Sequence, residues 1–188
     1  NDQFCSVFTQ EDSNIPSKGP SPYSSISDLI VSESGVLKLL KDLNPNKATG
    51  PDELPPRVLR LVAEPLAPIL TFIIQQSLDS GSLPQDWVFA NVVGIYKKGD
   101  KSCPANYHPV SLTSLVCKLA EHIILSHVGK HLSNNNIIIE NQHGFREKLS
   151  CETQLIQAID DWARSLDHTG QTDVLLLDFS KAFDTVPH

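Results

Sequence analysis

The sequence predicts an α+β fold in which helices outnumber strands. Four stretches repeat apolar residues at helical spacing, at residues 32–43, 56–80, 114–132 and 151–168. A stretch rich in β-branched residues at 90–96 has a return at 106–113, and the short apolar run Val174–Leu177 ends in Asp178. Helices followed by a strand that ends in a carboxylate fit helices packed on one face of a sheet.

Length and composition are those of a globular domain. The 188 residues are 40% hydrophobic and 20% charged, which is enough for one sizeable core or two small ones. The longest apolar run, residues 69–74, is interrupted by Thr71, so we expect no membrane contact. The four scattered cysteines form no CxxC pair and predict reduced thiols in an intracellular protein. The net charge of −7 means that any nucleic-acid-binding surface must be local.

We expect the first 31 residues to be a connector or linker and not part of a packed core. Residues 10–27 are rich in Ser, Pro and Gly, which is typical of a linker. From Ser32 or Ser34, each a possible cap, an apolar stripe predicts a helix that Asn44-Pro45 ends. The following residues 46–56 contain two glycine or proline pairs and predict a defined turn.

Residues 56–80 are apolar around much of the helix circumference, so we expect a buried helix. Pro65 and Pro68 should kink this helix or split it in two, and Gly81 should end it. Residues 114–132 predict another helix, on which His127 and His131 are four apart. With no matching acidic or Cys partner nearby, we expect these histidines to be structural or solvated.

The predicted hairpin at 90–113 has lysines at its turn, namely Lys97, Lys98 and Lys101. Such a hairpin can hold a triphosphate, because ammonium groups act as point charges that need no fixed geometry. The alternative is an ordinary solvated surface. Further along, residues 151–168 predict an amphipathic helix that Gly170 ends.

Asp178 follows the apolar run directly and leaves two interpretations open. It is either a cap of the next turn or helix, or a metal ligand held at the edge of a rigid strand.

Four blocks together resemble one family. They read NPNKATGPDELPPRVL, VVGIYKKGDKSCPANYHPVSLTS, NQHGFREKLSC and VLLLDFSKAFDTVPH. In this order and spacing they are similar to the reverse transcriptase of LINE- and jockey-type non-LTR retrotransposons. The resemblance runs from Val36 to His188 and implies a right-hand polymerase fold. Fingers would occupy about residues 32–172 and the start of the palm 173–188. Residues 1–31 would be the connector from an upstream endonuclease domain.

The resemblance also implies a site. Asp178 matches the family's first catalytic Asp and would bind Mg²⁺ together with the carbonyl of Phe179. Phe183 lies where an aromatic ring excludes a 2′-hydroxyl and selects deoxynucleotides, and Asp184 would organise the turn. Lys97 or Lys98 would contact the triphosphate of the incoming dNTP, and Arg146 the template.

Three departures from the family pattern affect these expectations. His108 replaces the Arg before Pro109, and an imidazole cannot make the forked contact of a guanidinium, which weakens nucleotide binding. Glu53 follows Asp52 where the family has Gly, which strains the turn if a positive φ is required. Residues 147–149 read Glu-Lys-Leu where the family has Lys-Gly-Arg.

The function implied is that of a partial RNA-directed DNA polymerase acting on an RNA template and a DNA primer. The family completes its site with an aromatic-Ala-Asp-Asp hairpin, and this sequence contains no such tetrapeptide. One carboxylate cannot hold two Mg²⁺ ions, so we expect no activity from this chain alone. One alternative is a non-catalytic nucleic-acid-binding remnant. A second, an aspartyl-phosphate phosphotransferase using Asp178 and Asp184, would need a glycine-rich phosphate loop, and the nine glycines are not clustered.

Overall fold

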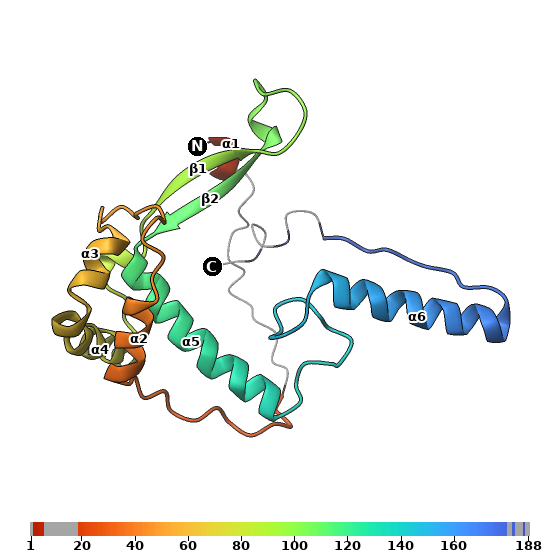
Figure 1. Ribbon diagram of the computed structural model, residues 1–188, viewed down its shortest axis with the longest axis horizontal. Helices are drawn as coiled ribbons and strands as arrows, with labels where there is room; N and C mark the ends of the chain where they lie inside the picture. Colours follow the sequence, from red (N-terminus) through yellow and green to blue (C-terminus); the bar gives the residue numbers. More distant parts are fainter. Residues whose placement is uncertain (1, 6–18, 180–181, 183–185, 187–188) are drawn as a thin grey trace. The chain divides into compact units, whose positions relative to one another are not determined.

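A computed structural model describes residues 2–5, 19–179, 182 and 186 (Figure 1). The chain divides into two compact units, residues 22–131 and residues 132–188, and short N-terminal segments are assigned to each. The helices are α1 (Asp2–Cys5), α2 (Glu33–Lys41), α3 (Pro56–Leu61), α4 (Ala63–Ser80), α5 (Leu115–Asn134) and α6 (Cys151–Thr169), and the strands are β1 (Ala90–Tyr96) and β2 (Tyr107–Thr113). Short 3₁₀ turns lie at Gln85–Trp87 and Pro104–Asn106. The mixed α and β content predicted from the sequence is confirmed.

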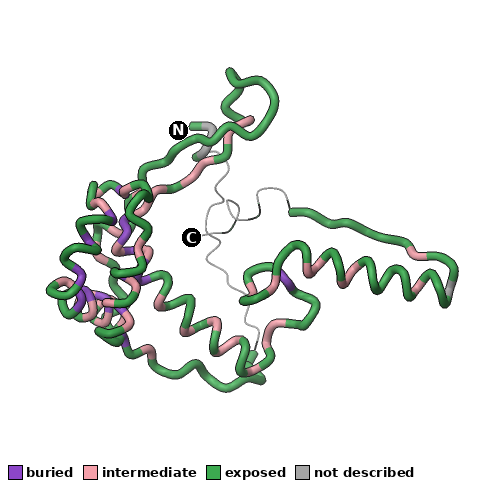
Figure 2. The backbone as a smooth tube through the Cα atoms, in the orientation of Figure 1, coloured by how far each residue is buried: buried purple, intermediate pink, exposed green. Residues whose placement is uncertain are grey.

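The core of the first unit is built by α2, α3, α4 and the start of α5. Val36 and Leu40 of α2 are fully buried, and α2 packs on α4 (Figure 2). On α4 the facing residues Ala63 and Ala67 are small, which allows close approach of the two helices. Leu115 and Leu119 of α5 complete the core.

The predicted cap and proline break are both present. The Ser32 hydroxyl accepts a hydrogen bond from the backbone N–H of Gly35 at 3.2 Å and begins α2. The helical run 56–80 is split at Val62 into α3 and α4. Pro65 has no N–H for the Leu61 carbonyl, and its ring would clash with that carbonyl, so α3 ends at Leu61. Gly81 ends α4 with φ 64°, as predicted.

The last residues of the predicted connector are tied into the core. The side-chain amide of Gln75 on α4 accepts from the Val31 N–H at 2.8 Å and donates to the Leu29 carbonyl at 3.2 Å. Nε2 of His127 on α5 lies 2.7 Å from the Ser27 carbonyl oxygen. Residues 27–31 therefore have fixed partners on two helices, and His127 has the structural role that its sequence context predicted.

The predicted hairpin is confirmed. β1 and β2 pair antiparallel, from Ala90 opposite Thr113 to Tyr96 opposite Tyr107. The connection spans residues 97–106 and contains the 3₁₀ turn Pro104–Asn106. Side chains order this connection: the Tyr96 hydroxyl donates to the Gly99 carbonyl at 2.6 Å, and the Asn106 amide donates to the Asp100 carbonyl at 2.8 Å.

The second unit is held by local contacts around the start of α6. Ser150 and Thr153 form a reciprocal capping box, and Gly170 ends the helix with φ 75°. The apolar stripe of α6 is exposed, with Leu155, Ile159 and Leu166 each half-exposed or more. In this unit the described residues therefore build little core of their own.

The predicted strand at Val174–Leu177 is wrong for this structure. Residues 171–179 form neither helix nor strand, and Leu175, Leu176 and Leu177 are 82%, 88% and 83% exposed. The described residues contain one sheet, made of β1 and β2, and no strand of that sheet pairs with this run. Because a strand is stabilised by its ladder partners, the apolar run stays extended without becoming one.

Two of the departures from the family pattern fall on strained backbone. Glu53 has φ 54° and Lys148 has φ 64°, and both stand where the family has Gly. The expectation that Glu53 would be strained is confirmed. In the same turn Gly50 is a close contact point: a Cβ there would lie 2.6 Å from the backbone of Thr113 and Ser114.

We expect Glu53→Gly to raise the free energy of unfolding by about 0.5–1 kcal/mol, because the left-handed conformation carries no Cβ penalty in glycine. Urea unfolding followed by circular dichroism measures the change. Glu53→Ala is the matched control, because it removes the carboxylate but keeps the Cβ, and should give no gain. An equal gain in both variants would assign the effect to the carboxylate.

We expect Gly50→Ala to lower the free energy of unfolding by about 1–3 kcal/mol, because the new methyl group meets backbone that cannot move aside. The control is Gly129→Ala in α5, where a Cβ meets nothing within 4 Å and alanine favours the helix. The same unfolding measurement should show loss at residue 50 and none at residue 129. Equal stability of the two variants would contradict the close contact.

Candidate functional site

The predicted site residues lie in three segments. Lys97, Lys98 and His108 belong to the hairpin of the first unit, and Arg146, Asp178 and Phe179 to the second unit. Phe183 and Asp184 lie outside the described residues.

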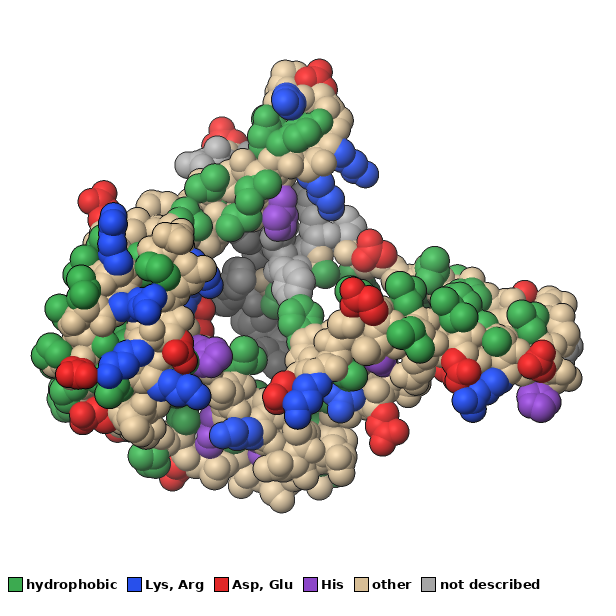
Figure 3. Space-filling view, in the orientation of Figure 1, with side chains coloured by type: hydrophobic (Ala, Val, Ile, Leu, Met, Phe, Trp, Pro, Cys, Tyr) green, Lys and Arg blue, Asp and Glu red, His purple; other side chains and the backbone are tan. Residues whose placement is uncertain are grey.

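The basic residues of the hairpin lie next to the Tyr96–Tyr107 pair, at the end of the ladder nearest the connection. The Lys97 N–H donates to the Asn106 carbonyl at 2.9 Å, which extends the ladder beyond Tyr96. His108 is exposed and lies opposite Ile95. Because side chains alternate along a strand, His108 and Lys97 belong to the same face. Basic side chains and a histidine gather along the hairpin (Figure 3).

Charges at the tip of the hairpin are partly paired. The Asp100 carboxylate accepts from the backbone N–H and the hydroxyl of Ser102, each at 2.8 Å. These bonds lower the pKa of Asp100, the backbone bond contributing most. Lys101 Nζ lies 5.5 Å from the centre of the Tyr96 ring, a cation–π distance. No salt bridge joins Lys97 or Lys98 to a residue that the structure describes. Two exposed ammonium groups are thus available to an anion.

The Arg146 side chain stabilises the loop in which it lies. Its Nη1 donates to the carbonyls of Ile139 at 3.1 Å, Glu140 at 3.3 Å and Gln142 at 3.5 Å. No salt bridge from Arg146 to an acidic residue is present in the described part of the chain. The guanidinium therefore shapes the loop, and its role toward a template stays a prediction.

His143 anchors the same loop on α6. Its side chain is buried, with Nδ1 2.9 Å from the Thr153 hydroxyl and Nε2 2.9 Å from Oε1 of Gln157. The sequence did not mark this residue, because its partners are ten and fourteen positions away. The one available signal was that Thr153 and Gln157 are four apart on a helix and share a face.

Asp178 and Phe179 are both exposed in the extended segment after α6. Among the residues that the structure describes, no group of three or more His, Cys, Asp and Glu could hold a metal ion. The described donor set thus does not by itself fit a two-ion centre, and metal binding by Asp178 stays a prediction.

The sequence matches the family described as "Reverse transcriptase (RNA-dependent DNA polymerase)" over residues 95–188, which is half of the chain. It is 29% identical over 154 residues to the RNA-directed DNA polymerase from mobile element jockey of Drosophila melanogaster. It is also 29% identical to the corresponding protein of Drosophila funebris, and 25% identical to the probable RNA-directed DNA polymerase from transposon BS of Drosophila melanogaster.

Each of these alignments covers 81% of this chain and 17% of the relative, so the chain spans a small part of its relatives' length. Within the described residues, no helix is both long and apolar enough to cross a membrane. The matched region holds β2, α5, α6 and the Asp178 segment, and begins at the end of β1. The chain therefore belongs to the reverse transcriptase family, as part of the reverse transcriptase domain of a non-LTR retrotransposon.

Proposed function

We propose that this chain supplies the fingers region and the first acidic segment of an RNA-directed DNA polymerase that copies an RNA template from a DNA primer. The observation that carries the proposal is the hairpin at the start of the matched region. Its lysines are exposed, and side-chain hydrogen bonds stabilise the connection from which they extend. The fingers are assigned to residues 32–172 and the start of the palm to residues 173–188. Residues 1–31 connect to an upstream endonuclease domain.

In this proposal the hairpin binds the triphosphate of a dNTP. Lys97 and Lys98 place positive charge on the phosphates, and His108 on the neighbouring strand is the third contact. Ammonium groups neutralise phosphate charge without demanding a fixed angle. An imidazole offers fewer donors than the guanidinium that the family has at this position, so His108 limits nucleotide affinity.

The second unit contributes groups for the template and for the metal ion. Arg146 contacts a template phosphate from its braced loop. Asp178, with the Phe179 carbonyl, provides ligands for Mg²⁺, and Phe183 excludes a 2′-hydroxyl. Nucleotidyl transfer uses two divalent ions, which need more than one carboxylate. The 188-residue polypeptide is therefore proposed to be inactive unless other residues complete the site.

A second candidate function is nucleic-acid binding without catalysis. The net charge of −7 is not spread evenly: residues 22–131 contain ten Lys and Arg and ten Asp and Glu, whereas the remaining residues contain five and twelve. Residues 22–131 thus have a formal net charge of zero and carry their basic residues in local groups. That distribution removes the main electrostatic objection to binding a polyanion.

We expect no primer extension by the purified polypeptide on an RNA template with dNTPs and Mg²⁺, because one carboxylate cannot hold both ions. Incorporation of labelled dNTP measures the activity, with a complete reverse transcriptase as positive control. Incorporation that disappears in Asp178→Ala would show that the chain is active by itself.

We expect His108→Arg to bind a dNTP about five- to tenfold more tightly, because a guanidinium can make a forked, charge-assisted contact with a phosphate. Fluorescence anisotropy of a labelled dNTP measures the affinity. His108→Gln, which is uncharged and not forked, should not gain, and Lys97→Gln/Lys98→Gln should weaken binding. Equal affinity of the Arg and Gln variants would remove residue 108 from the nucleotide site.

A further inference from the structure

The outer edge of β1 carries backbone groups without a partner strand. The Lys97 N–H donates to the carbonyl of Asn106, the residue opposite it, at 2.9 Å. Backbone groups of successive strand residues point in opposite directions, so every second residue of β1 counted back from Lys97 bonds to β2. The residues between these point their N–H and C=O groups away from β2, and they are Ala90, Val92, Gly94 and Tyr96. Within the described residues the sheet consists of β1 and β2 alone, so these groups face no further strand.

The outer edge of β2, in contrast, is protected. Pro109 lies opposite Gly94, so its nitrogen belongs to the outer edge of β2, where proline has no N–H to donate. At the end of the same strand, the backbone of Thr113 lies close against Gly50 in the turn before α3. The sequence of β1 contains no proline and no charged residue. Of the two edges, that of β1 is therefore the one open to another strand.

The side chains along β1 are apolar and exposed. Val92, Val93 and Ile95 are each about half-exposed, as is Phe89 just before the strand. Apolar side chains are visible along the hairpin (Figure 3). An uncharged strand that combines exposed apolar side chains with unpaired backbone groups is a template for pairing with a further strand.

We propose that the open edge of β1 pairs with the same edge of a second copy of this chain, antiparallel and about a two-fold axis. Such an isologous contact requires a surface that is complementary to itself. The register that pairs all seven residues of β1 places Val93 opposite Val93 of the second copy. The same register makes Val92 and Gly94 a hydrogen-bonded pair, so the outward groups of each strand meet those of the other. The two hairpins then form one continuous sheet.

The charges near β1 favour a second copy as the partner. Because β1 itself is uncharged, no like charges meet within the paired strands. The antiparallel register brings Lys97 and Lys98 of one copy toward the segment that precedes β1 in the other. The one charged residue in that segment, residues 82–89, is Asp86. The lysines of the two copies are thus kept at opposite ends of the pair, and each set approaches a segment of opposite charge.

The test uses the whole 188-residue chain, and sedimentation equilibrium over a wide range of protein concentration measures its mass. We expect a monomer–dimer equilibrium. Val93→Lys should weaken dimerisation about tenfold or more, because it places two ammonium groups opposite each other at the axis. Val93→Glu should weaken it similarly, because it opposes two carboxylates. Circular dichroism checks that both variants are folded, which is expected because residue 93 is half-exposed.

An equimolar mixture of Val93→Lys and Val93→Glu chains should recover the dimer, because the charges that meet at the axis then have opposite signs. Only a contact that places residue 93 opposite itself predicts this recovery. A mixture that stays as monomeric as each variant alone would overturn the two-fold pairing of β1.

The matched control is Ser111→Lys, at an exposed residue opposite Val92 on β2. It adds the same charge to the same hairpin, on the strand whose edge Pro109 protects, so dimerisation should stay as in the unaltered chain. Equal weakening by Ser111→Lys and Val93→Lys would contradict the proposal, because total charge would then be responsible. A dimer that Ile159→Glu abolishes and Val93→Lys leaves intact would instead assign the contact to the exposed side of α6.

Amide hydrogen exchange measured by NMR identifies the strand that pairs. The N–H groups of Val92, Gly94 and Tyr96 should exchange more slowly as protein concentration rises, because they are bonded only in the dimer. The N–H groups of Val93 and Ile95 bond to β2 in both states, so their exchange should not respond in this way. A dimer without slower exchange at residues 92, 94 and 96 would place the contact elsewhere. A chain that stays monomeric at every concentration would exclude a second copy as the partner.

Discussion

The burial of α2 against α4 is the interaction on which the first unit depends. Val36 and Leu40 have no exposed surface, and burying side chains of this size contributes about 1.5–3 kcal/mol each. Ala63 and Ala67 allow the approach, and Leu115 brings α5 onto the same core. The hairpin leads directly into α5 and meets the turn before α3 at Gly50, so the hairpin and this turn are both attached to the packed core.

The second unit is stabilised differently. Its buried residues are few among those described, and the apolar side of α6 and the run at 174–177 face solvent. What holds its shape is a set of local hydrogen bonds: the capping box at Ser150, the contacts of His143 with Thr153 and Gln157, and the Arg146 bonds to backbone carbonyls. Such bonds contribute about 1 kcal/mol each, less than a hydrophobic core would supply.

Two positions at which this sequence departs from the family pattern have strained backbone. Glu53 and Lys148 adopt left-handed conformations in which the family has glycine. In each case a non-glycine residue holds a backbone conformation that favours glycine. The surrounding contacts must therefore determine the backbone: Gly50 packed on Thr113 and Ser114 in the first turn, and Arg146 and His143 in the second.

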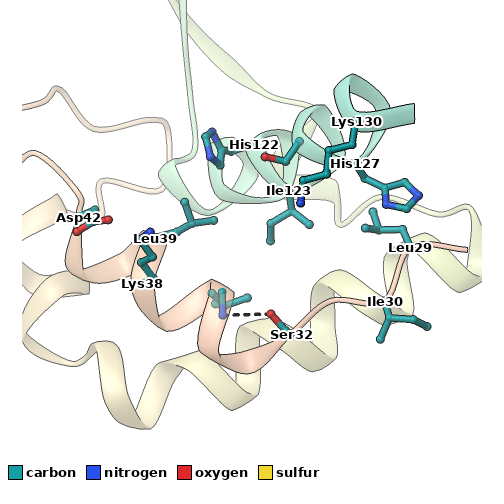
Figure 4. Close-up of a pocket in the computed structure, with 13 residues that line it drawn as sticks. Leu29, Ile30, Ser32, Lys38, Leu39, Asp42, His122, Ile123, His127 and Lys130 are labelled. Carbon is teal, nitrogen blue, oxygen red and sulfur yellow. Dashed lines mark hydrogen bonds between the residues drawn. The ribbon is translucent and has the colours of Figure 1, made fainter. Parts of the chain in front are cut away.

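The sequence by itself determined the elements whose signals are local: the helix capped by Ser32, the proline break, the hairpin strands and the glycine ends of α4 and α6. Four motif blocks also determined the family. Tertiary structure decided the features that depend on contacts between segments distant in the sequence. The apolar run before Asp178 has strand chemistry, yet it forms no strand, because a ladder needs a partner. Gln75 acquires its role only from backbone groups 44 and 46 positions away, and His143 from side chains ten and fourteen positions away on the next helix. The cavity between α2, α5 and the segment before α2 (Figure 4) likewise exists only because three separate segments meet, which is a property of packing and not of any one stretch of sequence.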